Sequence, residues 1–309
     1  MDKLIDFSSR PVRVAIQLLL QDKSTKKNII WATDPPELLA PDVTDKSEIT
    51  PQQLIRAGQD TIQPRIAKVM ENQTERTRKK GEVFTPAWIC NLMNNACDEE
   101  WFGRQDVFNT MAQQTWDVTP PPIEFPPGKT WKHYVDSRRL EITCGEAPYL
   151  VSRYDASTGQ AIPPDRRIGI LDRKLRVVNE NTDNVDDWFQ WTLRAFQSVY
   201  GYEYQGDNLL VARVNLLLTF VEYYTQRWQE QPAEKAVLKI ANVIAWNLWQ
   251  MDGLNDVVPF GKPYEEFEQL SMFDSFEEKS ERPASIPCKV FDWRKGSSQL
   301  FMDLKKEGQ

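Results

Sequence analysis

The stretch that decides the fold is Leu140-Glu141-Ile142-Thr143-Cys144-Gly145-Glu146-Ala147-Pro148-Tyr149-Leu150. It reads as the end of a strand that carries an acidic residue, followed by a tight turn at Gly145 and a second apolar run. In nucleotide-type sites a glycine at this place lets the backbone pass close to the ligand. An acidic side chain at the strand tip then binds hydroxyl or amino groups of the ligand. Taken alone, the pattern also fits an ordinary turn between a strand and a helix.

Two further stretches stand on either side of this turn. Upstream is Gly81-Glu82-Val83-Phe84-Thr85-Pro86, and downstream is Tyr200-Gly201-Tyr202-Glu203-Tyr204-Gln205-Gly206-Asp207-Asn208. The downstream stretch again places an acidic residue, Glu203, at the end of strand-like residues. An apolar run over 209–224 follows, and it carries Arg213 and Glu222, so we expect a buried helix rather than a membrane span.

The chain divides into three parts on its patterns. Residues 1–80 predict a helical N-terminal extension, with helical apolar spacing over 12–20 and 54–70. Thr50, followed by a proline and by Gln53, predicts a capping box at the start of the second helix. Residues 81–265 alternate apolar runs with helical patterns, which is typical of an α/β domain. Residues 266–309 read as an acidic linker and a short C-terminal tail that is strand-like over 288–293.

Composition limits the classes of function. The net charge is −7 and the isoelectric point is about 5.1, whereas DNA binding by one chain needs a basic face. We therefore expect DNA to be bound through a partner. The four cysteines fit no CxxC pattern and His133 is the only histidine, so we expect no metal site. The N-terminus lacks the build of a signal peptide, which favours a cytoplasmic protein with reduced cysteines.

In this order, the three stretches resemble motifs X, I and II of the N6-adenine DNA methyltransferases, which use S-adenosylmethionine (SAM). Residues 140–150 resemble motif I, typically Leu-Asp-Pro-Ala-Cys-Gly-Ser-Gly-Ala-Phe-Leu, and match it outright at Leu140, Cys144, Gly145 and Leu150. The resemblance to motif X implies that Phe84 packs beside the methionine moiety of SAM. The resemblance to motif II implies that Glu203 accepts both ribose hydroxyls, which suits a carboxylate.

A fourth stretch, 247–254, resembles motif III, in which an aspartate accepts from the adenine amino group of SAM. Asp252 would take that role, with Leu254 against the ring. The resemblance covers about 80 to 260. It implies a Rossmann-like SAM-dependent methyltransferase fold, SAM as cofactor, and a restriction-modification or related defence system. The implied cofactor-binding residues are Phe84, Thr85, Pro86, Glu141, Thr143, Gly145, Glu203, Asp252 and Leu254.

Two residues of the motif I stretch depart from the family pattern. Ala147 stands at the second glycine, so it adds a methyl group where the backbone and the ligand lie closest. Glu146 stands at the usual serine, and it brings a negative charge near the carboxylate of the methionine moiety. That pairing is unfavourable unless the Glu146 side chain points away.

The family's base-binding motif IV, Asn/Asp/Ser-Pro-Pro-Tyr/Phe, does not follow Asp252. The one candidate is Asp34-Pro35-Pro36-Glu37, with glutamate where the stacking ring belongs, and a turn that starts at Asp34 is the alternative. Two hypotheses remain. In the first, the chain is the SAM-binding part of a DNA adenine methyltransferase, inactive alone, which acts in a hetero-oligomer that supplies motif IV and target recognition. In the second, it is a non-catalytic regulatory, assembly or decoy subunit.

Overall fold

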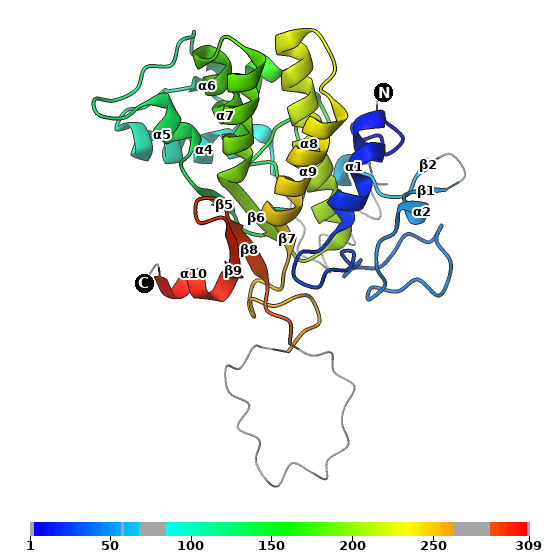
Figure 1. Cartoon of the computed structure of the whole chain (residues 1–309). Coiled ribbons are helices and arrows are strands. Elements are labelled where there is room, and N and C mark those ends of the chain that lie inside the picture. The colour runs from blue at the N-terminus through cyan, green and yellow to red at the C-terminus, as the bar shows by residue number, and fades with distance from the viewer. Residues whose placement is uncertain (1–2, 57–58, 68–84, 263–284, 308–309) are drawn as a thin grey trace.

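The computed structural model describes residues 3–56, 59–67, 85–262 and 285–307, and a parallel sheet lies at its centre (Figure 1). The sheet consists of β5 (Arg139–Glu141), β6 (Val199–Glu203) and β7 (Leu248–Gln250), in the order β5-β6-β7. Glu141 pairs with Gly201, and Glu203 pairs with Gln250. The prediction of an α/β chain is confirmed, and the carboxyl ends of all three strands share one edge.

Helices connect these strands, as parallel pairing requires. The helices α6 (Ile170–Asn181) and α7 (Val185–Gln197) lie between β5 and β6 in the chain. Between β6 and β7 lie α8 (Gly206–Trp228) and α9 (Glu234–Asn247), which pack against each other. The buried helix predicted over 209–224 is confirmed, because α8 is buried along most of its length.

The two faces of the sheet are covered differently, because successive side chains of a strand point to opposite faces. Val199 belongs to the main apolar core that the helices form. Tyr200 and Tyr202 belong to the other face, where they pack with a small apolar cluster that contains Trp249 and Phe301. The covering segment consists of β8 (Lys289–Asp292), β9 (Ser297–Leu300) and α10 (Phe301–Glu307). The strand predicted in the C-terminal tail is therefore confirmed, while most of the predicted linker lies outside the described residues.

The N-terminal part joins the main core. The helix α1 (Arg10–Leu20) packs against α8 and α9, as Figure 1 shows. The fully buried Arg213 of α8 donates hydrogen bonds to the carbonyl oxygens of Leu19, at 2.5 Å, and Leu248, at 3.0 Å. One side chain thus ties the end of α1 to the start of β7.

The helix predicted over 54–70 is wrong at residues 55–56 and 59–67, while residues 57–58 and 68–70 lie outside the described residues. The capping box at Thr50 is present, but the helix that it starts, α2 (Pro51–Leu54), ends after four residues. The antiparallel pair β1 (Ile55–Arg56) and β2 (Gln59–Asp60) follows, and then a 3-10 turn over Arg65–Ala67. Gly58 and Pro64 explain the failure, because glycine weakens a helix and proline supplies no backbone N–H.

The remaining elements flank α6. The helix α4 (Ala87–Phe102) is joined to α6 by the buried ion pair between Asp98 and Arg173, at 2.5 Å. The hairpin β3 (Asn109–Ala112) and β4 (Thr115–Val118) is followed by α5 (Trp131–Val135), and a 3-10 turn spans Pro164–Arg166. Among the described residues, none of the helices combines the length and the apolar character needed to cross a membrane.

Candidate ligand-binding site

A cavity of about 980 Å³ lies at the carboxyl ends of β5 and β6. Open parallel sheets bind their ligands at this edge, in the crevice beyond the strand ends. The turn after β5 and the residues that follow β6 line the cavity, together with Arg65 and Asp45 from the N-terminal part. The volume is large enough for a nucleoside-sized ligand.

Glu203 and Gly145 connect the two strand ends. Gly145 has a φ of +55°, a left-handed conformation that glycine adopts without steric cost. Its N–H donates to Oε2 of Glu203 at 2.8 Å, and the N–H of Gln205 donates to Oε1 at 3.1 Å. Burial raises the pKa of Glu203. A carboxylate has about four acceptor positions, so about two remain for hydrogen bonds from a ligand.

Glu141 is the second buried carboxyl group of the site. It accepts the N–H of Leu150 at 3.2 Å and, more weakly, that of Tyr149 at 3.4 Å. Burial raises the pKa of Glu141 to about 8, and the nearby negative charge of Glu203 acts in the same direction. Glu141 is therefore largely protonated at neutral pH, and a cation bound in the cavity would lower the pKa of both carboxyl groups.

Arg65 lies across the Gly145 turn. Its guanidinium packs against the turn so closely that a Cβ on Gly145 would be 3.5 Å from Nη2. The backbone N–H of Arg65 donates to Oε1 of Glu146 at 2.5 Å, and the hydroxyl of Tyr154 donates to Oε2 at 2.7 Å. The Glu146 charge is thus hydrogen-bonded within the protein. Ala147 belongs to the apolar core and does not line the cavity.

Aromatic rings complete the cavity wall. Tyr204 directly follows Glu203 and meets Phe260 edge to face, with ring centroids 6.0 Å apart. Both rings line the cavity. Arg65, Tyr204 and Phe260 were not among the site residues predicted from the sequence. The position of Tyr204 next to Glu203 could have indicated it, whereas the other two lie far away in the sequence and carry no comparable signal.

The structure brings most of the predicted cofactor residues together. The cavity is lined by Thr85, Glu141, Thr143, Gly145 and Glu203. Pro86 is next to Thr85 and is the N-cap residue of α4, while Phe84 lies outside the described residues. Residues of the stretches that resemble motifs I and II, together with Thr85, therefore line one cavity.

The predicted motif III residues lie elsewhere. Asp252 closes its own turn after β7 by accepting the N–H of Leu254 at 3.0 Å and the side-chain amide of Asn255 at 2.8 Å. Leu254 is 94% exposed, and neither Asp252 nor Leu254 lines the cavity. A contact with a ligand in this cavity would require the turn to move, so their roles stay predictions.

Asp34, the residue predicted as a catalytic candidate, is adjacent in the sequence to residues that line the cavity. Ala32 and Thr33 line the cavity, and Asp34 follows them directly without lining it. The turn in this segment is closed by the N–H of Leu39 and the carbonyl of Pro36, at 3.0 Å, so it begins after Asp34. A catalytic role of Asp34 stays a prediction.

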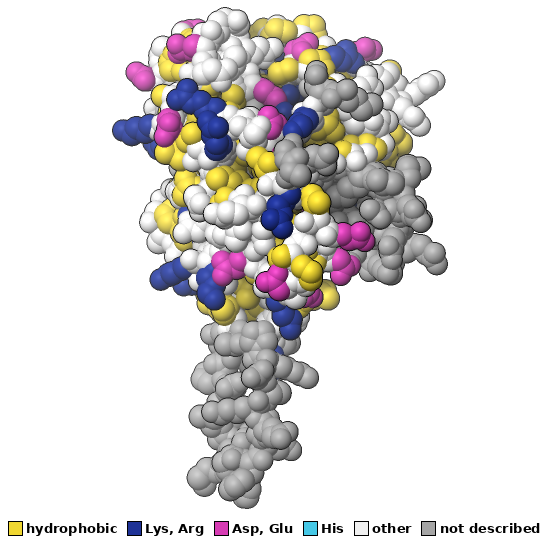
Figure 2. Space-filling model, turned by 90° about the vertical axis from the view of Figure 1, so that its right-hand side faces the viewer, with side chains coloured by type: hydrophobic (Ala, Val, Ile, Leu, Met, Phe, Trp, Pro, Cys, Tyr) yellow, Lys and Arg dark blue, Asp and Glu magenta, His cyan; other side chains and the backbone are white. Residues whose placement is uncertain are grey.

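Metal sites and nucleic-acid sites both need clusters of particular side chains. Among the described residues, there is no cluster of three or more His, Cys, Asp and Glu side chains that could hold a metal ion. Positive and negative side chains are interspersed on the face that Figure 2 shows. Four basic residues that follow one another closely in the sequence, Arg76, Arg78, Lys79 and Lys80, lie outside the described residues.

No protein-family model, no curated protein and no solved structure matches this chain. The resemblance to adenine methyltransferases therefore rests on the motifs themselves and on the cavity that their residues line.

Proposed function

We propose that this chain is the SAM-binding part of a site-specific DNA adenine-N6 methyltransferase from a restriction-modification or defence system, with a Rossmann-like fold. The base-binding motif and target recognition would come from another polypeptide. The observation that carries the proposal is the hydrogen bond from Gly145 to Glu203, at 2.8 Å, beside a cavity of about 980 Å³. Residues of two motifs, far apart in the sequence, meet there as SAM binding requires.

Each part of SAM has a matching group in this cavity. The free acceptor positions of Glu203 suit the two ribose hydroxyls, and the neighbouring Tyr204 and Phe260 offer aromatic surface for the adenine ring. The sulfonium cation suits a cavity that contains the two carboxyl groups of Glu141 and Glu203. The guanidinium of Arg65 can pair with the carboxylate of the methionine moiety.

One observation favours the second candidate function, a non-catalytic regulatory, assembly or decoy subunit. Arg65 packs on Gly145, where the backbone of a SAM site has to stay open to the ligand. If Arg65 keeps that position, the cavity binds SAM weakly or not at all. The two candidate functions therefore differ in what replacement of Arg65 does.

Titration calorimetry with SAM tests the proposal. The wild-type chain should bind, and Glu203→Ala should weaken binding by about 1–3 kcal/mol, because the ribose hydroxyls lose their acceptor. Glu234→Ala is a matched control, since Glu234 is exposed on α9, does not line the cavity and should leave the affinity unchanged. No binding at roughly millimolar SAM, or equal affinity of Glu203→Ala and wild type, would contradict the assignment.

Arg65→Ala separates the two candidate functions. If Arg65 pairs with the SAM carboxylate, the variant binds SAM more weakly than the wild type. If Arg65 obstructs the site, the variant binds SAM more tightly, and the regulatory or decoy function gains support. Methyl transfer after addition of a partner that carries motif IV would establish the first function.

A further inference from the structure

Two segments that are far apart in the sequence meet beside the C-terminal half of α9. One is the loop over 21–28, which an antiparallel bridge between its first and last residues closes. The other is β8, whose first residue, Lys289, donates its backbone N–H to Oγ of Ser24 at 2.9 Å. Nζ of Lys23 reaches α9, where it donates to Oδ1 of Asn242 at 3.1 Å. The loop, the strand and the helix therefore form one continuous surface.

This surface carries four lysines. Lys26, Lys27 and Lys289 are exposed and Lys23 is partly exposed, and none of the four forms an ion pair with another described residue. Asp22 is the acidic residue of the loop, but it is only 4% exposed and its carboxylate accepts backbone N–H groups of the loop itself. In a chain of net charge −7, these lysines form a local patch of positive charge. Such a patch attracts polyanions.

Three aromatic rings lie next to these lysines. Nζ of Lys23 is 5.5 Å from the centroid of the Trp246 ring on α9. The ring centroids of Trp246 and Phe291 are 5.2 Å apart, and those of Phe291 and Trp293 are 4.4 Å apart. Lys289 and Phe291 are two residues apart on β8, so they share one face of the strand. All three rings are partly exposed, so the surface combines lysines with aromatic rings.

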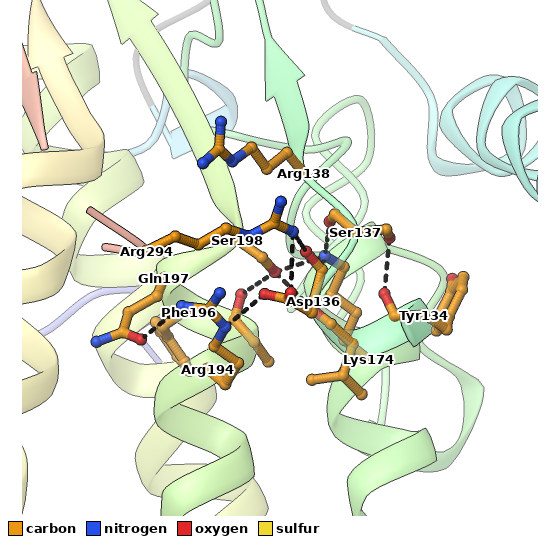
Figure 3. A network of polar contacts seen from close by, with 12 residues as sticks. Tyr134, Asp136, Ser137, Arg138, Lys174, Arg194, Phe196, Gln197, Ser198 and Arg294 are labelled. Carbon is orange, nitrogen blue, oxygen red and sulfur yellow. Dashed lines mark hydrogen bonds and ion pairs between the residues drawn. The ribbon is translucent and has the colours of Figure 1, made fainter. Parts of the chain in front are cut away.

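Polar contacts hold this end of β8 in place, away from the candidate ligand-binding site. The indole N–H of Trp293 donates to Oδ1 of Asn247 at 2.7 Å, where α9 leads into the amino end of β7. The next residue, Arg294, pairs with Asp136 at 2.9 Å, as Figure 3 shows. The cavity described above lies at the carboxyl ends of the strands, and Trp246, like the other two rings, does not line it. The surface is therefore separate from that cavity.

We propose that this surface binds a single-stranded nucleic acid. The lysines pair with successive phosphates, while unpaired bases stack on the rings of Trp246, Phe291 and Trp293. A duplex fits less well, because its bases are stacked on one another and cannot reach the rings. An acidic peptide would use the lysines but leave the rings without a partner. The inference goes beyond the proposed function and does not depend on SAM binding.

Fluorescence anisotropy with labelled oligonucleotides tests the proposal on the full chain. The probes are an oligothymidylate and an oligouridylate of about twelve nucleotides each. Binding of either one supports the proposal, and the tighter of the two shows whether the ligand is DNA or RNA. An abasic strand of the same length and charge should bind at least about tenfold more weakly, because it cannot stack on the rings. A duplex of the same length and a polyglutamate peptide should also bind more weakly.

The salt dependence of binding counts the phosphate contacts. Each contact to a single strand contributes roughly 0.7 to the slope of the logarithm of affinity against the logarithm of salt concentration. Contacts from all four lysines should therefore give a slope of about −3. Two-dimensional NMR of the wild-type chain gives a further measurement that needs no variant. The indole N–H resonances of Trp246 and Trp293 should shift in a saturable manner when the oligonucleotide is added.

Variants of the protein locate the binding surface. Lys289→Glu should weaken binding of the tighter oligonucleotide at least about fivefold and reduce the magnitude of the salt slope by about 0.7, because one phosphate contact is lost. Arg104→Glu is the matched control, since it makes the same change of charge at an exposed residue and should leave binding unchanged. Arg104 follows α4, which lies away from α9 and β8 (Figure 1).

Three results would overturn the proposal. The first is no binding of either oligonucleotide at roughly 1 mM. The second is equal or tighter binding of the abasic strand, the duplex or polyglutamate, because the rings would then have no role. The third is binding that Lys289→Glu leaves unchanged, or that Arg104→Glu weakens to the same extent. Failure of SAM binding alone would leave these results unaffected.

Discussion

Replacing Glu141 with glutamine should stabilise the chain, and more so as the pH rises. The pKa of Glu141 is raised from 4.5 to about 8 by burial. Between these pH values the folded chain holds a proton that the unfolded chain has lost. The contribution of this group to stability therefore falls as the pH rises through that window. Glutamine does not ionise, and its single oxygen can still accept the N–H of Leu150, while the longer contact with the N–H of Tyr149 on the other carboxylate oxygen is lost at both pH values.

The size of the effect follows from the two pKa values. At ~1.4 kcal/mol for each pKa unit, the difference between 4.5 and about 8 corresponds to a free energy on the order of 5 kcal/mol at most. Water entering the cavity when Glu141 ionises reduces this amount. We expect the stability gain of Glu141→Gln over wild type to be at least about 2 kcal/mol larger at about pH 9 than at about pH 5.

Urea unfolding followed by tryptophan fluorescence measures this difference. Glu234→Gln is the matched control, because Glu234 is exposed on α9 and its replacement should have the same small effect at both pH values. A gain of Glu141→Gln that is equal at the two pH values would refute the reasoning. It would mean that the carboxyl group is solvated in the folded chain.

Arg213→Met should lower the free energy of unfolding by about 3 kcal/mol, because it removes the side chain that donates to the buried carbonyls of Leu19 and Leu248. Urea unfolding measures this loss, and a value below about 1 kcal/mol would contradict the prediction. Gly206→Ala should prevent soluble expression, since the new Cβ would lie 1.9 Å from the carbonyl oxygen of Ile30. The control Gly296→Ala places a Cβ with nothing within 4 Å, and it should lower the free energy of unfolding by only about 1 kcal/mol. The isolated chain should transfer no label from tritiated SAM to unmethylated DNA, because no base-binding motif accompanies the cavity. Label on adenine would contradict this prediction, and Asp34 would then be the first candidate for the catalytic residue.

The parallel sheet and its helices could be predicted because their signals are local. The strands β5 and β6 end at the acidic residues Glu141 and Glu203, and the helix over 209–224 is apolar enough to be recognised. The segment over 55–67 could not be predicted in the same way. Its apolar spacing fits a helix, but the carbonyl of Leu54 instead accepts the N–H of Thr61, at 2.9 Å, as the chain turns back. Tertiary packing decides such weakly helical segments.

Only some of the residues of the site could be recognised from the sequence. Glu141, Gly145 and Glu203 belong to recognisable stretches, so their meeting at one cavity could be expected. Arg65 carries no motif, and only the folded chain shows that it packs on Gly145. Asp252 illustrates the opposite case, because its stretch fits a motif while its carboxylate is used by its own turn.

The central claim is that SAM binds where Gly145 donates to Glu203. Backbone amide NMR of the isotope-labelled chain during SAM titration tests it most directly. The account predicts that the resonances of Gly145 and Gln205, whose N–H groups both bind Glu203, shift in a saturable manner, while those of the β8–β9 hairpin do not. Unchanged Gly145 and Gln205 resonances at roughly millimolar SAM, or saturable shifts confined to another region, would contradict it.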